Sequence, residues 1–226
     1  MMGGIIGRHR RFFITGTDTG VGKTYFACRL IEQLIARGER VGIFKPIETG
    51  LSTREASDAV RLITAARSNV PIESVSPYRF RTAAAPRVAA HRERRRINPR
   101  TIRSSFESIS AGQRWMIVEG AGGLKVPIQK HYDMTDLILA LGIPVILVSL
   151  QRIGAINQTL LSLHFAKNRG LNILAVILNQ PEAVPADSPL HDNQKMIEDE
   201  CDVPVLTFRR QKSEMEKKHF WKKLLG

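Results

Sequence analysis

Short apolar runs alternate along the chain with segments whose apolar residues recur at helical spacing. The runs occupy residues 11–15, 40–46, 115–123, 144–150, 171–180 and 204–208. The helical patterns occupy residues 24–38, 57–67, 99–111, 135–141, 155–169 and 189–200. Runs without polar alternation are typical of strands buried on both faces of a parallel sheet. We therefore predict an α/β fold, a doubly wound, mostly parallel sheet with helices on both faces.

The alternation continues without an internal repeat or a low-complexity linker. A length of 226 residues suits one domain with a sizeable core. We expect residues 1–226 to form this single domain, with residues 1–10 flexible and residues 211–226 forming a basic C-terminal helix or tail.

The stretch GTDTGVGKT, residues 16–24, joins the first predicted strand to the first predicted helix. A phosphate-binding loop usually reads G-x-x-x-x-G-K-[ST]. Here the first glycine comes one position early, at Gly16, and Thr17 stands in its usual place. The flanking strand and helix are the required context, because free N–H groups at a helix N-terminus attract anions. We predict a variant phosphate-binding loop on a P-loop NTPase-like fold.

Residue types in this loop have distinct chemical roles. Lys23 is expected to reach the β- and γ-phosphates of a nucleotide, and the Thr24 hydroxyl to ligate Mg²⁺. The predicted nucleotide-binding residues of the loop are Gly16, Thr17, Asp18, Thr19, Gly20, Val21, Gly22, Lys23 and Thr24.

Polar residues occur near the ends of three other strands, at Lys45, Glu119 and Asn179. Carboxyl ends of parallel strands share one edge of the sheet, so these side chains are predicted beside the loop. A carboxylate there can complete a Mg²⁺ shell, and a second lysine can neutralise charge on a transferred phosphoryl group. Asp58 is a candidate second carboxylate, with a helix cap as the alternative.

An ordered series of motifs resembles the dethiobiotin synthetase family. The loop matches the family's variant G-T-D-T-x-V-G-K-T throughout, which accounts for the shifted glycine. The other matching stretches, in order, are FKPIETG (44–50), SDA (57–59), PYRF (77–80), VEGAGG (118–123), VILV (145–148), GAIN (154–157) and ILNQ (177–180). Each stretch is weak alone, but the ordered set, which spans roughly residues 11–208, is specific.

This resemblance implies an ATP-dependent ligase of biotin biosynthesis. Family members convert 7,8-diaminononanoate, CO₂ and MgATP into dethiobiotin, ADP and phosphate. A carbamate formed on one amine attacks the γ-phosphate, and the second amine then closes the ureido ring and expels phosphate. At matching positions the resemblance implies catalytic roles for Lys23 and Lys45. It implies Mg²⁺ ligands at Thr24, Asp58 and Glu119.

The same resemblance implies the remaining contacts. Asn179 corresponds to an adenine-reading asparagine, and Thr49 stands where the family often has a substrate-contacting serine. The family forms a homodimer, in which Gly154 and Asn157 begin a helix that holds the substrate carboxylate across the subunit interface. The substrate-binding residues implied are Lys45, Thr49, Gly120, Ala121, Gly122, Gly154 and Asn157.

The chain departs from the family pattern at two places. Arg87 stands where the family often has a histidine in its second substrate loop. Residues 207–212 lack the proline that usually follows the last strand near the purine. The sequence therefore does not fix which nucleotide is preferred.

Net charge is +13, and nine arginines lie between Arg79 and Arg103 with only Glu93 opposing them. This stretch has no interleaved aromatic residues and no nucleic-acid-binding motif. We therefore expect a solvated basic face that attracts anionic substrates, without a nucleic-acid or membrane partner. Cys28 and Cys201 form no CxxC pair, and the N-terminus does not read as a secretory signal, which favours a cytoplasmic protein.

Two alternative functions stay open from the residues themselves. The first is a related ATP-dependent amidotransferase or synthase acting on a cofactor precursor. The second is a partition-type switch ATPase that binds DNA or membrane. Such switches usually carry a signature lysine near the start of the loop, where this chain has Asp18.

Overall fold

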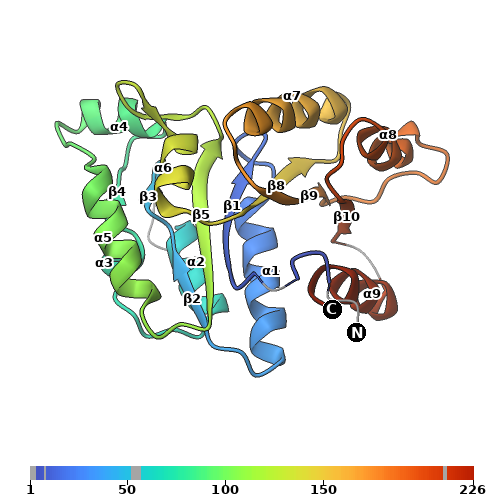
Figure 1. Ribbon diagram of the computed structural model, residues 1–226, viewed down its shortest axis with the longest axis horizontal. Coiled ribbons are helices and arrows are strands. Elements are labelled where there is room, and N and C mark those ends of the chain that lie inside the picture. Colours follow the sequence, from blue (N-terminus) through green and yellow to red (C-terminus); the bar gives the residue numbers. More distant parts are fainter. Residues whose placement is uncertain (1–3, 8, 52–56, 211–212) are drawn as a thin grey trace.

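The computed structural model describes residues 4–7, 9–51, 57–210 and 213–226. A six-stranded sheet in the order β10-β9-β8-β1-β5-β2 forms its centre, and every neighbouring pair is parallel (Figure 1). Its strands are β1 (Arg11–Gly16), β2 (Val41–Phe44), β5 (Trp115–Gly123), β8 (Val145–Leu150), β9 (Ile173–Gln180) and β10 (Val205–Arg209). The predicted parallel sheet is confirmed, because each of these strands falls on one of the apolar runs.

Helices cover both faces of this sheet (Figure 1). One face carries α1 (Lys23–Ala36), α2 (Asp58–Ala65), α3 (Ile72–Val75) and α9 (Glu214–Leu225). The other carries α4 (Pro86–Arg92), α5 (Pro99–Ser110), α6 (Met134–Leu141), α7 (Ala155–Asn168) and α8 (Asn193–Asp199). Side chains of β1 alternate between the two layers, Phe12 and Ile14 packing toward α1 and Phe13 toward α6. Both faces are buried, which explains the apolar runs.

Two small sheets and two short helices, α3 and α4, were absent from the predicted elements, whereas the helical pattern predicted at 189–200 is divided into a 3₁₀ helix and α8. Strand β3 (Ile47–Glu48) pairs in parallel with β4 (Tyr78–Arg79), and β6 (Pro127–Gln129) pairs antiparallel with β7 (Tyr132–Asp133). The 3₁₀ helix η1 (Pro189–Asp192) precedes α8. Strands of two or three residues carry no detectable period, so their pairing is visible only in three dimensions.

Residues 4–7, part of the segment expected to be flexible, pack instead against the C-terminal helix. The backbone N–H groups of Ile5 and Ile6 donate to the carbonyls of Lys223 and Leu224 at 3.0 and 3.1 Å. The Ile6 side chain is fully buried. The expectation is thus corrected for these four residues, because α9 supplies both backbone acceptors and an apolar surface.

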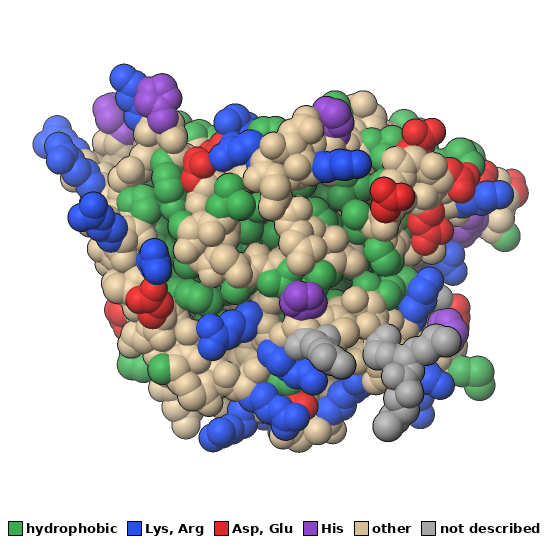
Figure 2. All heavy atoms as spheres, in the orientation of Figure 1, with side chains coloured by type: hydrophobic (Ala, Val, Ile, Leu, Met, Phe, Trp, Pro, Cys, Tyr) green, Lys and Arg blue, Asp and Glu red, His purple; other side chains and the backbone are tan. Residues whose placement is uncertain are grey.

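Charged side chains are unevenly distributed over the surface. Lys and Arg gather near α4, and Asp and Glu gather over α8 at the other end of the molecule (Figure 2). The exposed arginines near α4 are Arg81, Arg87, Arg92, Arg94, Arg95, Arg96, Arg100 and Arg103. Within the described ranges, no helix has the length and apolar character needed to cross a membrane.

Candidate functional site

The loop between β1 and α1 is shaped by its glycines. A Cβ on Gly16 would lie 2.7 Å from Val21 Cγ2 and 2.9 Å from the Asp18 carbonyl oxygen. A Cβ on Gly22 would lie 2.0 Å from Asn179 Nδ2, and Gly22 also has a left-handed φ of 94°. Only glycine fits these positions without rearrangement. The early glycine therefore belongs to a compact loop that folds back on itself.

Lys23 begins α1 and curls back over this loop. Its Nζ donates to the Asp18 carbonyl oxygen at 2.8 Å. Burial, and then the neighbouring charge of Lys45, lower the pKa of Lys23 to about 8. The ammonium thus lies beside the loop at the N-terminus of α1, where a bound anion would be attracted by both.

Lys45, just after β2, is the centre of a buried charge cluster. Its Nζ lies 2.5 Å from Glu119 Oε1, 2.9 Å from Asp58 Oδ2 and 3.2 Å from the Gly120 carbonyl oxygen. The Thr24 hydroxyl donates to the same Glu119 Oε1 at 2.7 Å. Lys45 is 3% exposed and Glu119 0% exposed. Residues from the end of β2, the middle of β5 and the first turns of α1 and α2 therefore meet at one point.

The pKa shifts in this cluster follow from burial and from the fact that two carboxylates, Asp58 and Glu119, share the single ammonium of Lys45. Burial lowers the pKa of Lys45, but attraction by Glu119 and Asp58 outweighs it and the net pKa is raised. Burial raises the pKa of Asp58, but Lys45 outweighs it and the net pKa is lowered. For Glu119, burial prevails over the attraction of Lys45, and Asp58 adds repulsion, so its pKa is raised. Lys45 stays charged because two carboxylates face it.

Glu48 on β3 holds Asp58 in place. It accepts hydrogen bonds from Ser57 Oγ at 2.8 Å and from the backbone N–H of Asp58. Ser57 is the N-cap residue of α2, accepting from the Val60 N–H at 3.3 Å. The Asp58 carboxylate is therefore not the cap and is free to meet Lys45. Sequence reasoning missed Glu48, although FKPIETG contains it.

The cluster suits a divalent cation. Glu119 Oε2 is buried and has no hydrogen-bond partner among the described residues. Thr24 and Asp58 add two more oxygen donors around the same carboxylate. Hard oxygen donors with one or two carboxylates are the set that Mg²⁺ prefers beside phosphates. The residues present therefore fit the predicted metal.

Asn179, near the end of β9, binds the backbone of the phosphate-binding loop. Its Nδ2 donates to the Val21 carbonyl oxygen at 2.9 Å. Its Oδ1 is buried and has no partner in the described part of the chain. On the adjacent residue, Gln180 Oε1 accepts from Arg209 Nε at 3.1 Å. Asn179 thus keeps one acceptor for a ligand beside the loop.

A cavity of about 390 Å³ opens in front of the charge cluster. Its lining residues are Thr19, Gly20, Gly22, Lys23, Thr24, Tyr25, Lys45, Ile47, Glu48, Thr49, Asp58, Arg61, Ala121 and Gly122. Of the predicted site residues, the cavity thus brings together Thr19, Gly20, Gly22, Lys23, Thr24, Lys45, Thr49, Asp58, Ala121 and Gly122. Tyr25, Glu48 and Arg61 are lining residues that sequence reasoning missed. Their positions next to matched motifs were the only signal.

Several predicted site residues do not line this cavity, namely Gly16, Thr17, Asp18, Val21, Glu119, Gly120, Asn179, Gly154 and Asn157. Gly154 (φ 87°) and Asn157, at the N-terminus of α7, are exposed and do not line it. Asn157 therefore does not contribute to the cavity of its own chain. Arg87 lines a separate cavity of about 410 Å³ with Lys125 and Arg169.

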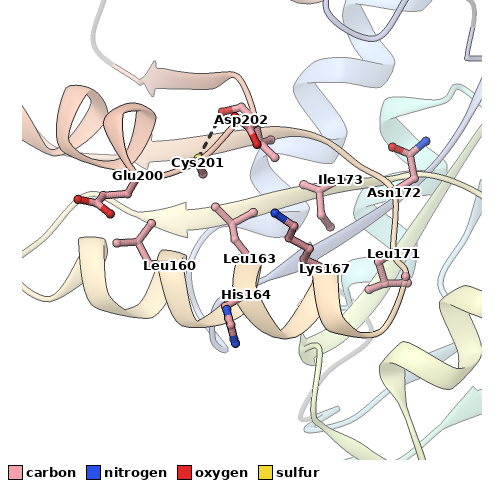
Figure 3. A pocket seen from close by; sticks show the side chains of 12 residues that line it. Leu160, Leu163, His164, Lys167, Leu171, Asn172, Ile173, Glu200, Cys201 and Asp202 are labelled. Atoms are coloured by element: carbon pink, nitrogen blue, oxygen red, sulfur yellow. Dashed lines mark hydrogen bonds between the residues drawn. The ribbon is translucent and has the colours of Figure 1, made fainter.

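The largest cavity found, about 680 Å³, lies elsewhere, between α7, the start of β9 and the connection from α8 to β10 (Figure 3). Leucine side chains point into it, and Lys167, Glu200 and Asp202 stand around them (Figure 3). It contains none of the predicted site residues and lies where β9 and β10 begin. Ligands of doubly wound folds bind where strands end, so the smaller cavity is the candidate site.

Comparison with known proteins shows the family of the chain. A family described as an AAA domain matches residues 10–208. The chain is 35% identical over 198 residues to the ATP-dependent dethiobiotin synthetase BioD of Bacillus velezensis, covering 87% of this chain and 84% of that protein. It is 37% identical over 196 residues to the BioD of Bacillus licheniformis, covering 86% and 83%.

A solved structure of the septum site-determining protein MinD with Mg-ADP, from Pyrococcus horikoshii, is similar in fold. The TM-score is 0.54 at 17% identity, covering 95% of this chain and 87% of that one. At this identity the likeness extends to the fold alone.

Proposed function

We propose that this chain, which belongs to the family of ATP-dependent dethiobiotin synthetases, closes the ureido ring of dethiobiotin from 7,8-diaminononanoate and CO₂. The observation that carries the proposal is the meeting of Lys23, Thr24, Lys45 and Asp58 in one cavity, with the buried Glu119 bonded to both Thr24 and Lys45. A phosphate-binding loop alone fits many ATPases. A second lysine held by two carboxylates at the same place fits the capture of a second anion, the carbamate.

The reaction divides between the two lysines. CO₂ adds to one amine, which loses a proton and becomes a carbamate. A carbamate oxygen then attacks the γ-phosphorus, the bond to the β-phosphate oxygen breaks, and ADP leaves. The second amine attacks the carbamoyl carbon, the C–O bond to phosphate breaks, and the ring closes with loss of a proton. Each charged intermediate needs a fixed cation, and Lys23 and Lys45 are two lysines that line the cavity beside the loop.

Thr24, Asp58 and Glu119 would hold Mg²⁺, which when bound neutralises phosphate charge during transfer. Glu119 supports this role because one of its buried oxygens has no hydrogen-bond partner among the described residues. Lys23 would bind the β- and γ-phosphates, since its ammonium already lies over the loop. Asn179 would accept a hydrogen bond from the base through its free Oδ1.

The second substrate would occupy the side of the cavity nearest Thr49, Ala121 and Gly122. Lys45 orients the carbamate there, because it also donates to the Gly120 carbonyl oxygen and is held rigidly. Phosphoryl transfer depends mainly on such positioning and charge.

A homodimer would complete the site. The N-terminus of α7 has no side-chain cap, and its free N–H groups suit a carboxylate. Gly154 and Asn157 do not line their own chain's cavity, so a contact with the bound substrate requires the helix of another subunit. Near them, Ile153 is 92% exposed and Leu161 63% exposed, and apolar exposure of this kind is typical of an interface.

The proposal places the reaction in the cytoplasm, where thiols stay reduced. Cys28 and Cys201 are both free. Burial raises the pKa of Cys28 to about 12, which keeps it a neutral thiol at cellular pH.

ATP turnover with and without diaminononanoate plus bicarbonate tests the proposal. We expect ADP release to depend on both and to match dethiobiotin formation measured by mass spectrometry. Turnover that responds to DNA or lipid instead would favour a partition-type switch. Turnover with another amine or carboxylate precursor would favour a related synthase, an outcome that the 35–37% identity to dethiobiotin synthetases argues against.

A further inference from the structure

Arg61 lies one turn after Asp58 on α2 and lines the same cavity as Lys23 and Thr24. Its guanidinium makes no hydrogen bond or ion pair within the part of the chain that the structure describes. Most other charges in the cavity are already matched, so an unmatched arginine here is unusual.

The other charged groups of the cavity can be paired one by one. Lys45 is neutralised by Asp58 and Glu119. Glu48 binds the first turn of α2 and faces Arg79 Nε at 3.6 Å. Lys23 and Arg61 remain as the uncompensated cations of the lining. MgATP carries roughly two net negative charges, so these two cations balance it.

The position of Arg61 points to the nucleotide and away from the second substrate. Its charge acts on Asp58 and on Cys28, which lies on α1 one turn beyond Thr24. Arg61 therefore stands over the first turns of α1, where Tyr25 also lines the cavity. The start of the helix after a phosphate-binding loop faces the phosphates of the nucleotide. Thr49 and Gly122 line the part of the cavity assigned above to the diamine.

We propose that Arg61 is a nucleotide-binding residue that pairs with a phosphate remaining on ADP. This inference rests on the proposed function, because it requires a nucleotide in this cavity. A guanidinium offers two parallel N–H donors to a phosphate, which an ammonium cannot do. Arg61 stabilises the bound nucleotide equally before and after transfer. It therefore contributes to affinity and leaves the rate of the chemical step unchanged.

The test compares R61Q with R67Q. Arg67 lies just beyond the same helix, is exposed, and does not line the cavity, so its loss removes the same charge at a different place. Titration calorimetry with MgADP should show at least about tenfold weaker binding for R61Q and less than about twofold for R67Q. R61K should recover part of the loss. The KM for ATP should rise in R61Q while kcat stays within about twofold.

If R61Q and R67Q weaken MgADP binding equally, the arginine acts only through its long-range charge, and the inference is wrong. The inference is also wrong if R61Q leaves the MgADP affinity unchanged and instead raises the KM for the diamine or lowers kcat. Arg61 is exposed, so R61Q is expected to fold, which a thermal melt checks; if it does not, R61K replaces it in the same comparison. Failure of the proposed function looks different, because wild-type ATP turnover would then not depend on diaminononanoate plus bicarbonate, whereas the MgADP affinities of R61Q and R67Q are measured without either substrate.

Discussion

Lys45 Nζ and Glu119 Oε1 lie 2.5 Å apart, where Lys45 follows the last residue of β2 and Glu119 lies within the neighbouring parallel strand β5. The strand pairing that forms the sheet thus also forms the charge cluster. Removing one partner of a buried ion pair typically costs about 3–5 kcal/mol, because the other charge stays buried. Variants at either position therefore need a stability measurement beside every activity measurement.

Lys23→Ala should fold and lose at least about 100-fold in turnover, or about 2.7 kcal/mol of transition-state stabilisation. The Lys23 side chain bonds only a loop carbonyl, so its loss leaves no partner charge buried. Steady-state dethiobiotin formation measures the effect, and circular dichroism checks the fold. Near-normal ATP-dependent activity in a folded variant would rule out the phosphate-binding role.

Glu119→Gln keeps the size of the side chain and removes its charge. We expect turnover to fall and the Mg²⁺ concentration for half-maximal activity to rise, because one metal ligand loses its charge. Lys45 keeps Asp58 as a partner, so the variant retains one half of the cluster. If the Mg²⁺ midpoint and the rate both match wild type, Glu119 has a structural role and another carboxylate binds the metal.

The sheet and the loop were predictable because their signals are local. An apolar run marks a buried strand, and the spacing of Gly16, Gly22 and Lys23 marks the loop. Glu48 was not predictable, because its role arises from contacts with Ser57 and the Asp58 N–H, which lie 9 and 10 residues along the chain and show no sequence period with it. Nor does a single sequence reveal what faces Asn157, since the contact between subunits that we propose there would leave no period in the sequence.

The affinity for ADP should fall as pH rises above about 8. Burial and the charge of Lys45 lower the pKa of Lys23 to about 8 in the free protein. Bound phosphates favour the ammonium and raise this pKa, so above pH 8 binding must take up a proton. ADP binding therefore becomes weaker as pH rises, by up to about tenfold per pH unit. Calorimetry in buffers from about pH 7.5 to about 9.5 measures it, with Lys23→Met as a pH-independent control. A flat wild-type profile would contradict the lowered pKa.

Gly22→Ala should destabilise the protein by about 3 kcal/mol, combining a left-handed backbone with overlap against Asn179. Gly38→Ala is the matched control, because Gly38 also has a positive φ, 79°, but its Cβ would meet nothing within 4 Å. It should cost only about 1 kcal/mol. Urea unfolding of both variants gives the comparison. Equal losses would mean that the contact with Asn179 relaxes freely and that backbone strain alone matters.

Asn157→Ala should raise the KM for diaminononanoate more than the KM for ATP. Asn157 is exposed and lies outside its own chain's cavity, so its proposed contact is with one substrate, bound to the partner subunit. Separate KM measurements at saturating levels of the other substrate decide this. A parallel rise in both values would point to a general loss of structure or assembly.

A mixed dimer tests the shared site directly. One chain carries Lys23→Ala, and the other carries Asn157→Glu, whose charge repels the substrate carboxylate and inactivates the sites that it reaches. If the site lies between subunits, a mixed dimer places both lesions in one site and leaves the other intact. Random exchange makes about half of the dimers mixed, so activity should return to about a quarter of wild type. Two affinity tags confirm that subunits have exchanged. With exchange confirmed, an unchanged low activity would mean that each chain builds its site alone.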